Sequence, residues 1–271
     1  MTKRSSAARS GGVRRRALVT GASVGIGAAF AERLAQEQYD VILVARGQKR
    51  LAALAERLQH HHGIRAEPVA ADLTDATQLH TVEDIAANDA TLELLVNNAG
   101  FGTFGCFGKL DADKEEAEIR LNVIALARLT RAALPGMIAR KQGAIINVSS
   151  MAGFQPAPYN ATYGATKAYV TSFTEALHEE LRGTGVRVQA LCPGFTRTEF
   201  QERAGIDVSQ IPSLAWMTPE SVVDASLAAL RRGQVVCVPG VGNRVLTAAV
   251  GVMPRRLARR LAGTLTRPYV E

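Results

Sequence analysis

The feature that most constrains the fold is the alternation of short, continuously apolar segments with stretches of helical periodicity. Apolar segments of strand length occur at residues 17–20, 40–45, 66–71, 92–96, 144–148, 186–191 and 235–238. Helical spacing occurs between them at residues 28–36, 49–59, 76–87, 115–139, 162–182 and 219–231, with Pro135 a candidate break. Strands that are apolar on both sides are typical of a parallel sheet covered by helices on both faces. The sequence therefore predicts a single-domain, doubly wound α/β fold of about seven strands.

A glycine-rich segment follows the first predicted strand and begins the first predicted helix. It reads TGASVGIG at residues 20–27 and contains Gly21, Ser23, Val24, Gly25, Ile26 and Gly27. Glycine lets the chain turn tightly and lets a pyrophosphate approach the N-terminus of a helix, where free N–H groups attract anions. The spacing differs from the dinucleotide-binding pattern G-x-G-x-x-G. Taken alone, it leaves open both nucleotide binding and a purely structural turn.

The end of the second predicted strand bears on the choice of nucleotide. An acidic residue there would bind the adenosine 2′-hydroxyl of NAD, but this chain has Ala45 and Arg46, followed by Lys49 and Arg50. Cations at this position suit the 2′-phosphate of NADP(H), and Ser23 could add a hydroxyl donor. The alternative is that Arg46 lies on a solvated helix start. The charges favour NADP(H).

Tyr163 and Lys167 lie four residues apart in the predicted helix 162–182, so they share one face of it. An ammonium near a phenol is expected to lower the pKa of Tyr163 from its reference value of about 10. A general acid–base that works near neutral pH needs such a shift. Taken alone, the same spacing also fits a surface helix face.

Polar residues follow two predicted strands at the edge of the sheet where their carboxyl ends meet. The segment 97–100 follows one strand, and Ser149 and Ser150 follow another. Sheets of this kind bind ligands at that edge. Asn122 is an amide in an otherwise apolar helical stretch, and because buried amides need partners, we expect a specific partner for it.

Together these motifs resemble the short-chain dehydrogenase/reductase family over roughly residues 15–240. The resemblance rests on TGASVGIG at 20–27, Asp72-Leu73 after the third strand, NNAG at 97–100, Asn122, NVSS at 147–150, YGATK at 163–167, and Pro193-Gly194. It implies a Rossmann-like fold and an NADP(H)-dependent oxidoreductase that interconverts a carbonyl and a secondary alcohol. The alternative function is a catalytically silent regulatory protein that binds NADP(H), which would not need an intact catalytic set.

The resemblance also implies residue roles. Tyr163 would exchange a proton with the substrate oxygen, and Ser150, rather than Ser149, would hydrogen-bond that oxygen. Lys167 would hold the nicotinamide ribose and lower the pKa of Tyr163, and Asn122 would fix a water of a proton relay. With the charge argument for Arg46, the expected cofactor-binding residues are Gly21, Ser23, Val24, Gly25, Ile26, Gly27, Arg46, Asp72, Leu73, Asn98, Ala99, Gly100, Tyr163, Lys167, Pro193, Gly194 and Thr196.

An irregular apolar segment at 195–217 corresponds to the part that folds over the substrate in this family. Its large apolar residues are Phe195, Phe200, Ile206, Ile211, Leu214, Trp216 and Met217, with Phe101, Phe104, Met151 and Phe154 as further candidate walls. Each of them could equally be a core residue. The segment favours a small hydrophobic ketone, 3-oxoacyl or steroid-like substrate.

The net charge of +7 is concentrated at the two ends of the chain. We expect a disordered basic arm at 1–14, a Rossmann-like catalytic domain at 15–243 and a basic amphipathic tail at 244–271. The tail could contact an anionic membrane surface, a partner subunit or its own domain. Nucleic-acid binding is not expected, because the basic charge is not on the body of the protein.

Three further expectations complete the sequence-based picture. Cys106, Cys192 and Cys237 are widely spaced and are expected to be buried apolar residues, and no metal site is expected. No run of about 18 apolar residues is present, so a spanning helix is not expected. The widely spaced cysteines suit a reducing cytosol, so we expect a cytoplasmic protein, with membrane association through the tail left open. By the family resemblance, we expect a homodimer or homotetramer that associates through the helices around 115–135 and 160–182.

Overall fold

The computed structural model describes residues 14–204 and 212–266, and its centre is a seven-stranded parallel sheet in the order β3-β2-β1-β4-β5-β6-β7. The strands are β1 (Arg16–Thr20), β2 (Asp40–Ala45), β3 (Ala66–Ala70), β4 (Leu92–Asn97), β5 (Gly143–Val148), β6 (Val186–Leu191) and β7 (Val236–Cys237). The strand order reverses at β1, which pairs with both β2 and β4 and so places a crevice at their carboxyl ends. The predicted fold class is confirmed.

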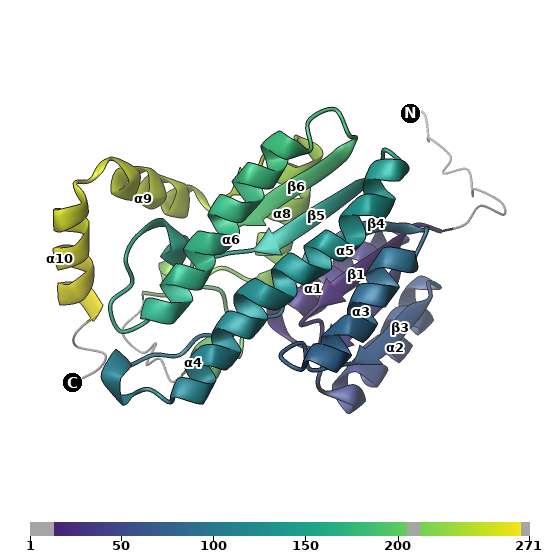
Figure 1. The fold of residues 1–271 in the computed structure, drawn as a ribbon, viewed down its shortest axis with the longest axis horizontal. Helices are drawn as coiled ribbons and strands as arrows, with labels where there is room; N and C mark the ends of the chain where they lie inside the picture. The colour runs from purple at the N-terminus through teal and green to yellow at the C-terminus, as the bar shows by residue number, and fades with distance from the viewer. Residues whose placement is uncertain (1–13, 205–211, 267–271) are drawn as a thin grey trace.

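Helices cover both faces of the sheet (Figure 1). One layer consists of α1 (Gly25–Gln36), α2 (Gln48–His62) and α8 (Pro219–Arg231), and the other of α3 (Ala76–Asn88), α5 (Leu126–Ala139) and α6 (Ala161–Glu180). Side chains alternate along each strand, so Val19 packs under the first layer and Leu18 under the second, both fully buried. Burial on both faces explains why the strands are continuously apolar.

The long helix predicted at 115–139 is divided in the structure, but not at Pro135. It consists of α4 (Ala112–Ile119), a π-helical segment (Arg120–Ala125) and α5, which runs through Pro135 without interruption. The candidate break at Pro135 is therefore wrong, and the irregularity lies around Asn122 instead. By length and hydropathy the stretch Ala112–Ala139 could cross a membrane, contrary to expectation. However, α5 packs against the sheet as a core helix.

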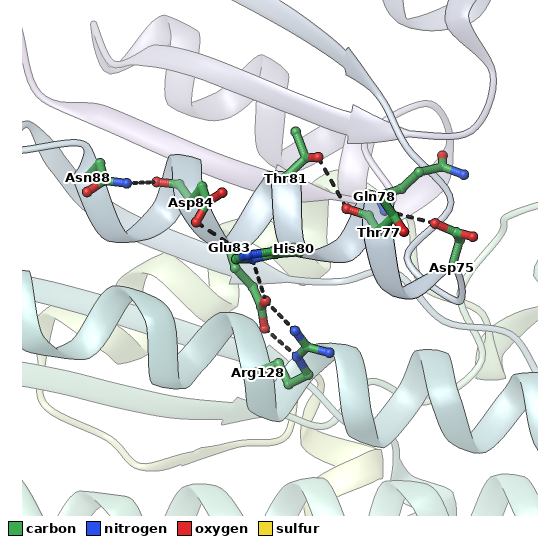
Figure 2. A network of polar contacts seen from close by, with 9 residues as sticks. All are labelled: Asp75, Thr77, Gln78, His80, Thr81, Glu83, Asp84, Asn88 and Arg128. Atoms are coloured by element: carbon green, nitrogen blue, oxygen red, sulfur yellow. Dashed lines mark hydrogen bonds and ion pairs between the residues drawn. The ribbon is translucent and has the colours of Figure 1, made fainter.

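Helix α3 is tied to α5 by an ion pair and is capped at its start, as Figure 2 shows. Arg128 on α5 binds Glu83 with two hydrogen bonds of 2.5 Å, which ties α3 to its neighbour. The side chain of Asp75 caps the start of α3 by accepting from the Gln78 N–H at 2.8 Å. The Gln78 side chain accepts in turn from the backbone N–H of Asp72 at 2.8 Å. The start of α3 thereby fixes the backbone of Asp72 at the end of β3.

The C-terminal region forms α9 (Val241–Val252) and α10 (Arg255–Thr266), which lie together at one end of the molecule (left in Figure 1), beyond α6 and α4. Short helices complete the described part: η1 (Phe107–Lys109), η3 (Met151–Phe154), α7 (Phe200–Arg203) and η4 (Ser213–Ala215). Residue 244, where the expected tail begins, lies within α9. The expected N-terminal arm, apart from Arg14, lies outside the described residues.

The cysteine expectation is correct for two of the three residues. Cys192 and Cys237 are buried at the ends of β6 and β7, whereas Cys106 is exposed. Cys106 directly precedes η1, a short surface helix with no buried residue, and this surface position explains its exposure. All three are free thiols.

Candidate active site

The glycine turn is joined to the end of β4 by hydrogen bonds. The Thr20 hydroxyl accepts from the backbone N–H groups of Asn98 and Ala99, each at 2.9 Å. The Asn98 side chain donates back to the carbonyl oxygens of Thr20 at 2.9 Å and Gly21 at 3.2 Å. These contacts span the point where the strand order reverses. They hold the turn and the β4 end as one rigid wall of the crevice.

Two glycines of the turn are required by its geometry. Gly21 has φ of +64°, a left-handed conformation that favours glycine. A Cβ at Gly27 would lie 2.2 Å from the carbonyl oxygen of Gly21, so α1 can pack this closely on the turn only without a side chain there. The resulting turn presents the N-terminus of α1 to the crevice, an arrangement suited to phosphate groups.

Arg46 and Asp72 lie opposite each other at the carboxyl ends of β2 and β3. Their side chains approach to 3.9 Å, and the Arg46 side chain is 77% exposed, so the guanidinium is available to an incoming anion. One carboxylate oxygen of Asp72 accepts from the N–H and hydroxyl of Thr74 at 2.9 and 2.7 Å. Nearby, Arg50 pairs with Glu199 at 3.2 Å across the crevice.

Tyr163, Ser150 and Lys167 meet at the end of β5. The Ser150 side chain hydrogen-bonds the phenol of Tyr163, and its oxygen also caps η3 by accepting from the Ala152 N–H at 3.1 Å. The Lys167 ammonium donates to the carbonyl oxygen of Val148 at 2.8 Å. The Ser149 hydroxyl instead donates to the Lys167 carbonyl oxygen at 2.8 Å and also hydrogen-bonds the Thr171 hydroxyl. The geometry thus favours Ser150 over Ser149 as the partner of Tyr163.

The ionisation of this group differs from the expectation. Burial raises the pKa of Tyr163 to about 12, with the charge of Glu118 adding to the rise and the Ser150 hydrogen bond opposing it. Burial lowers the pKa of Lys167 to about 8. The expected lowering of the tyrosine pKa is therefore wrong for this structure. The main reason is the burial of the phenol, and the Lys167 ammonium, which donates to the Val148 carbonyl oxygen and lies 5.5 Å from the ring centre, does not offset it.

Asn122 has the specific partners that were expected of a buried amide. Its oxygen accepts from the backbone N–H of Phe101 at 3.2 Å, and its nitrogen donates to the carbonyl oxygen of Phe101 at 2.8 Å. The nitrogen also reaches the hydroxyl of Thr166 on α6 at 3.1 Å. Asn122 therefore joins the loop after β4 to the helix that carries Tyr163 and Lys167.

One cavity of about 1890 Å³ brings the predicted site together. Its wall contains Ser150, Tyr163 and Lys167 and all of the predicted cofactor-binding residues except Gly27, which packs behind the turn. Asn122 also lies behind the wall, fully enclosed. The cavity extends from Arg46 and Asp72 past the glycine turn to Tyr163, an elongated shape that could hold a dinucleotide with its reactive end at the tyrosine.

The apolar wall was only partly anticipated. Phe101, Phe104, Met151, Phe154, Phe195 and Phe200 line the cavity. Trp216 packs on the Phe195 ring at 5.6 Å, Met217 packs on the core, and neither lines the cavity. Ile206 and Ile211 lie outside the described residues. Helix α9 adds Leu246, Thr247 and Val250, which no sequence motif marked.

Sequence reasoning also missed two buried carboxyl groups beside the site. Glu115 and Glu118 on α4 are 8% and 0% exposed. Glu115, Glu118 and Asn122 follow one another at spacings of three and four residues, which places them on one helix face. This shared face with a buried amide was the signal that could have found them, although the other residues of α4 are exposed or half-buried.

Comparison with known proteins agrees with this geometry. The family model of short chain dehydrogenases matches residues 15–208. A ketoacyl reductase from a Nostoc species is 33% identical over 219 residues, which cover 79% of this chain and 74% of that protein.

Two solved structures are also similar. A short-chain dehydrogenase from Sphingobium yanoikuyae in complex with NADPH is 40% identical with a TM-score of 0.82, covering 91% of this chain and 94% of that one. A bulky-bulky ketone specific alcohol dehydrogenase from Comamonas testosteroni is 34% identical with a TM-score of 0.76, covering 88% of this chain and 93% of that one. The chain belongs to the short-chain dehydrogenase/reductase family.

Proposed function

We propose that this protein is an NADP(H)-dependent oxidoreductase that interconverts a carbonyl and a secondary alcohol on a hydrophobic substrate. The observation that carries the proposal is that Ser150, Tyr163 and Lys167 line the same cavity as the glycine turn. A cofactor bound at the glycine turn and a substrate bound at Tyr163 would then lie in the same cavity. The family membership and the NADPH complex of the Sphingobium relative support this assignment.

The residues fit NADP(H) at both ends of the cavity. A Cβ at Gly100 would lie 2.8 Å from Asn122 Oδ1 and 3.5 Å from Lys167 Nζ, so only glycine lets this part of the cavity wall pack closely on Asn122. Arg46 would pair with the 2′-phosphate, and Asp72 with Leu73 would hold the adenine. Val24 and Ile26 of the turn would lie at the diphosphate, and Pro193 with Thr196 at the nicotinamide. Bound NADPH would supply the hydride.

Tyr163 holds the proton that reduction needs. With a pKa raised to about 12 it is a phenol at neutral pH, so it can donate to the oxygen of a carbonyl as that oxygen becomes an alcohol. Ser150 orients the phenol and donates to the same oxygen. Lys167 orients the ribose and stabilises the phenolate left behind. Asn122 maintains the connection of these groups to the loop after β4.

The cavity wall supports a hydrophobic substrate. Phe104, Phe154 and Phe200 line the cavity beside Tyr163, and Leu246 with Val250 close it from α9. The ring of Phe200 contacts that of Tyr163 with centres 5.3 Å apart. The names of the Nostoc and Comamonas relatives, a ketoacyl reductase and an enzyme for bulky ketones, point in the same direction.

The test is NADPH oxidation measured against a panel of bulky ketones, 3-oxoacyl compounds and steroid ketones. We expect turnover with at least one hydrophobic class and weak activity with small polar ketones. The alternative, a silent NADP(H)-binding regulator, predicts tight NADPH binding with no turnover across the panel. That result would replace the proposed function.

We also propose that the outer surface of α9 and α10 contacts anionic lipid. Val241, Val245, Val252, Leu257 and Leu261 are exposed there. Residues 241–266 contain no acidic residue, and Arg256, Arg259 and Arg260 are exposed on α10. Replacing these three arginines with glutamine should abolish co-flotation with anionic vesicles and leave the fold unchanged. Equal flotation of both proteins would reject the proposal.

A homodimer or homotetramer is proposed through α4–α6. Ile119 on α4, Ile124 on the π-helical segment and Ile138 on α5 are exposed, and Tyr169 is exposed on α6, where it stacks on Phe173. We expect Ile124→Glu to reduce the molar mass measured by light scattering. A mass that equals the monomer already in the wild type would reject the assembly.

A further inference from the structure

A pair of buried carboxyl groups lies behind the catalytic residues and has no role in the proposed chemistry so far. Glu115 and Glu118 on α4 meet the loop after β4 at Thr103. Both oxygens of Glu115 have hydroxyl partners, Thr103 and Thr162. Glu118 accepts from the backbone N–H and the hydroxyl of Thr103 through one oxygen only, at 2.9 and 3.0 Å.

The hydrogen bonds around Thr103 indicate that one of the two carboxyl groups, Glu115 or Glu118, carries a proton. The Thr103 hydroxyl lies within hydrogen-bond distance of both carboxyl groups but has a single proton to donate. The second oxygen of Glu118, Oε1, is buried and has no hydrogen-bond partner among the described residues. An unpaired buried carboxylate oxygen is expensive, so the neutral acid is the favoured form of Glu118, whereas Glu115 is satisfied as a carboxylate.

The charge of Glu118 acts on the catalytic pair. Among the described residues, the charged and titratable groups that act on Glu118 are Glu115 on its own helix and Lys167 on α6. Glu118 in turn raises the pKa of both Lys167 and Tyr163, and the buried thiol of Cys192 acts in the same direction on both. Burial raises the pKa of Glu118 to about 7, close to the value of about 8 for Lys167.

We propose that Glu118 is a positioning residue whose buried charge sets how tightly Lys167 holds its proton during catalysis. When Glu118 is ionised, its carboxylate stabilises the Lys167 ammonium; when it is neutral, Lys167 loses its proton more readily. The two groups titrate as one coupled pair. Glu118 contacts neither substrate nor cofactor, and its second task is to hold Thr103 and the loop 101–103, whose Gly102 packs on the Tyr163 ring.

The inference rests on the proposed reductase function for its kinetic test. Glu118→Gln keeps an oxygen that can accept from the Thr103 N–H and removes only the charge. In this variant, kcat for ketone reduction should begin to fall with rising pH roughly one pH unit lower than in the wild type. The reason is that Lys167 and Tyr163 hold their protons less tightly without the charge of Glu118. Glu118→Asp should restore part of the shift. Glu116→Gln is the control, since Glu116 is exposed and pairs only with Arg120 in the described structure.

A second measurement needs no activity. Infrared difference spectra of the wild-type protein across a pH titration should show the carbonyl band of a buried neutral acid disappearing near neutral pH, and Glu118→Gln should lack the band while Glu116→Gln keeps it. An active wild type with unchanged pH profiles in Glu118→Gln, or a wild type without this band, would overturn the inference. An inactive wild type that still shows the band would instead count against the proposed function and support the buried acid.

Discussion

The ammonium of Lys167 is anchored to the carbonyl oxygen of Val148, 2.8 Å away, and lies 5.5 Å from the ring centre of Tyr163. Val148 is the last residue of β5, and Ser150, two residues later, hydrogen-bonds the Tyr163 phenol. The end of one strand therefore aligns both side chains of the α6 pair. In the proposed mechanism, catalysis depends on the contact between β5 and α6, and this contact can be tested through the two serines.

Replacing Ser150 should mainly reduce catalysis, whereas replacing Ser149 should mainly reduce stability. Ser150→Ala removes the partner of Tyr163, so we expect kcat to fall about a hundredfold, with only a small fall in melting temperature from the lost cap on η3. Ser149→Ala removes hydrogen bonds to the Lys167 carbonyl oxygen and Thr171, so we expect a loss of about 1 kcal/mol of stability and a smaller effect on kcat. Steady-state kinetics and thermal unfolding measure both. A large fall in kcat for Ser149→Ala with little effect of Ser150→Ala would show that Ser149 is the partner of Tyr163 and would contradict the assignment.

Arg46 should determine the preference for the phosphorylated cofactor. Arg46→Asp replaces an exposed cation with an acid where the 2′-phosphate is proposed to bind, so the Kd for NADPH should rise at least about tenfold. The Kd for NADH, which lacks this phosphate, should change little or fall. Titration calorimetry with both cofactors measures the difference. Equal losses for NADPH and NADH would show that Arg46 does not recognise the phosphate.

Gly27 should be intolerant of any side chain. Gly27→Ala places a Cβ 2.2 Å from the Gly21 carbonyl oxygen, so we expect a loss of at least about 2 kcal/mol of stability and of NADPH binding. Gly108→Ala is the matched control, because a Cβ there meets no atom within 4 Å, and we expect a change within about 0.5 kcal/mol. Chemical denaturation of both variants tests this. Comparable stability of the two would mean that α1 can move away from the turn.

The stability of the protein should depend on pH through Glu118. Its pKa is raised from 4.5 to about 7, so the unfolded chain releases this proton at a lower pH than the folded one. The contribution of Glu118 is fully present below about pH 4.5 and is lost as the pH rises through about 7, at most roughly 3 kcal/mol. Glu118→Gln should therefore gain stability relative to the wild type between about pH 5 and 8. A constant difference across that range would contradict the shifted pKa.

The sequence could predict the parts of the structure that depend on local pattern. The strand runs, the glycine turn and the start of α8 at Pro219 follow from apolar periodicity and backbone requirements, and the structure contains them. The ionisation of Tyr163 could not be read this way. It depends on burial and on Glu118, whose proximity is created only when α4 and the loop after β4 fold together.

The same limit applies to the cavity and to the helix irregularity. Leu246 and Val250 reach the cavity because α9 folds back over it, which no local motif encodes. The π-helical segment around Asn122 replaced the expected break at Pro135. Tertiary contacts of Asn122 with Phe101 and Thr166 hold that segment, whereas α5 continues through Pro135.

The most direct test of the central claim is a comparison of the wild type with Tyr163→Phe in NADPH-dependent reduction of a hydrophobic ketone. The substitution removes the phenolic proton and keeps the ring that packs on Gly102 and Phe200. We predict that the wild type reduces the ketone, and that Tyr163→Phe binds NADPH normally but loses kcat by at least about a thousandfold. Unchanged turnover in Tyr163→Phe would show that another group supplies the proton and would contradict the account.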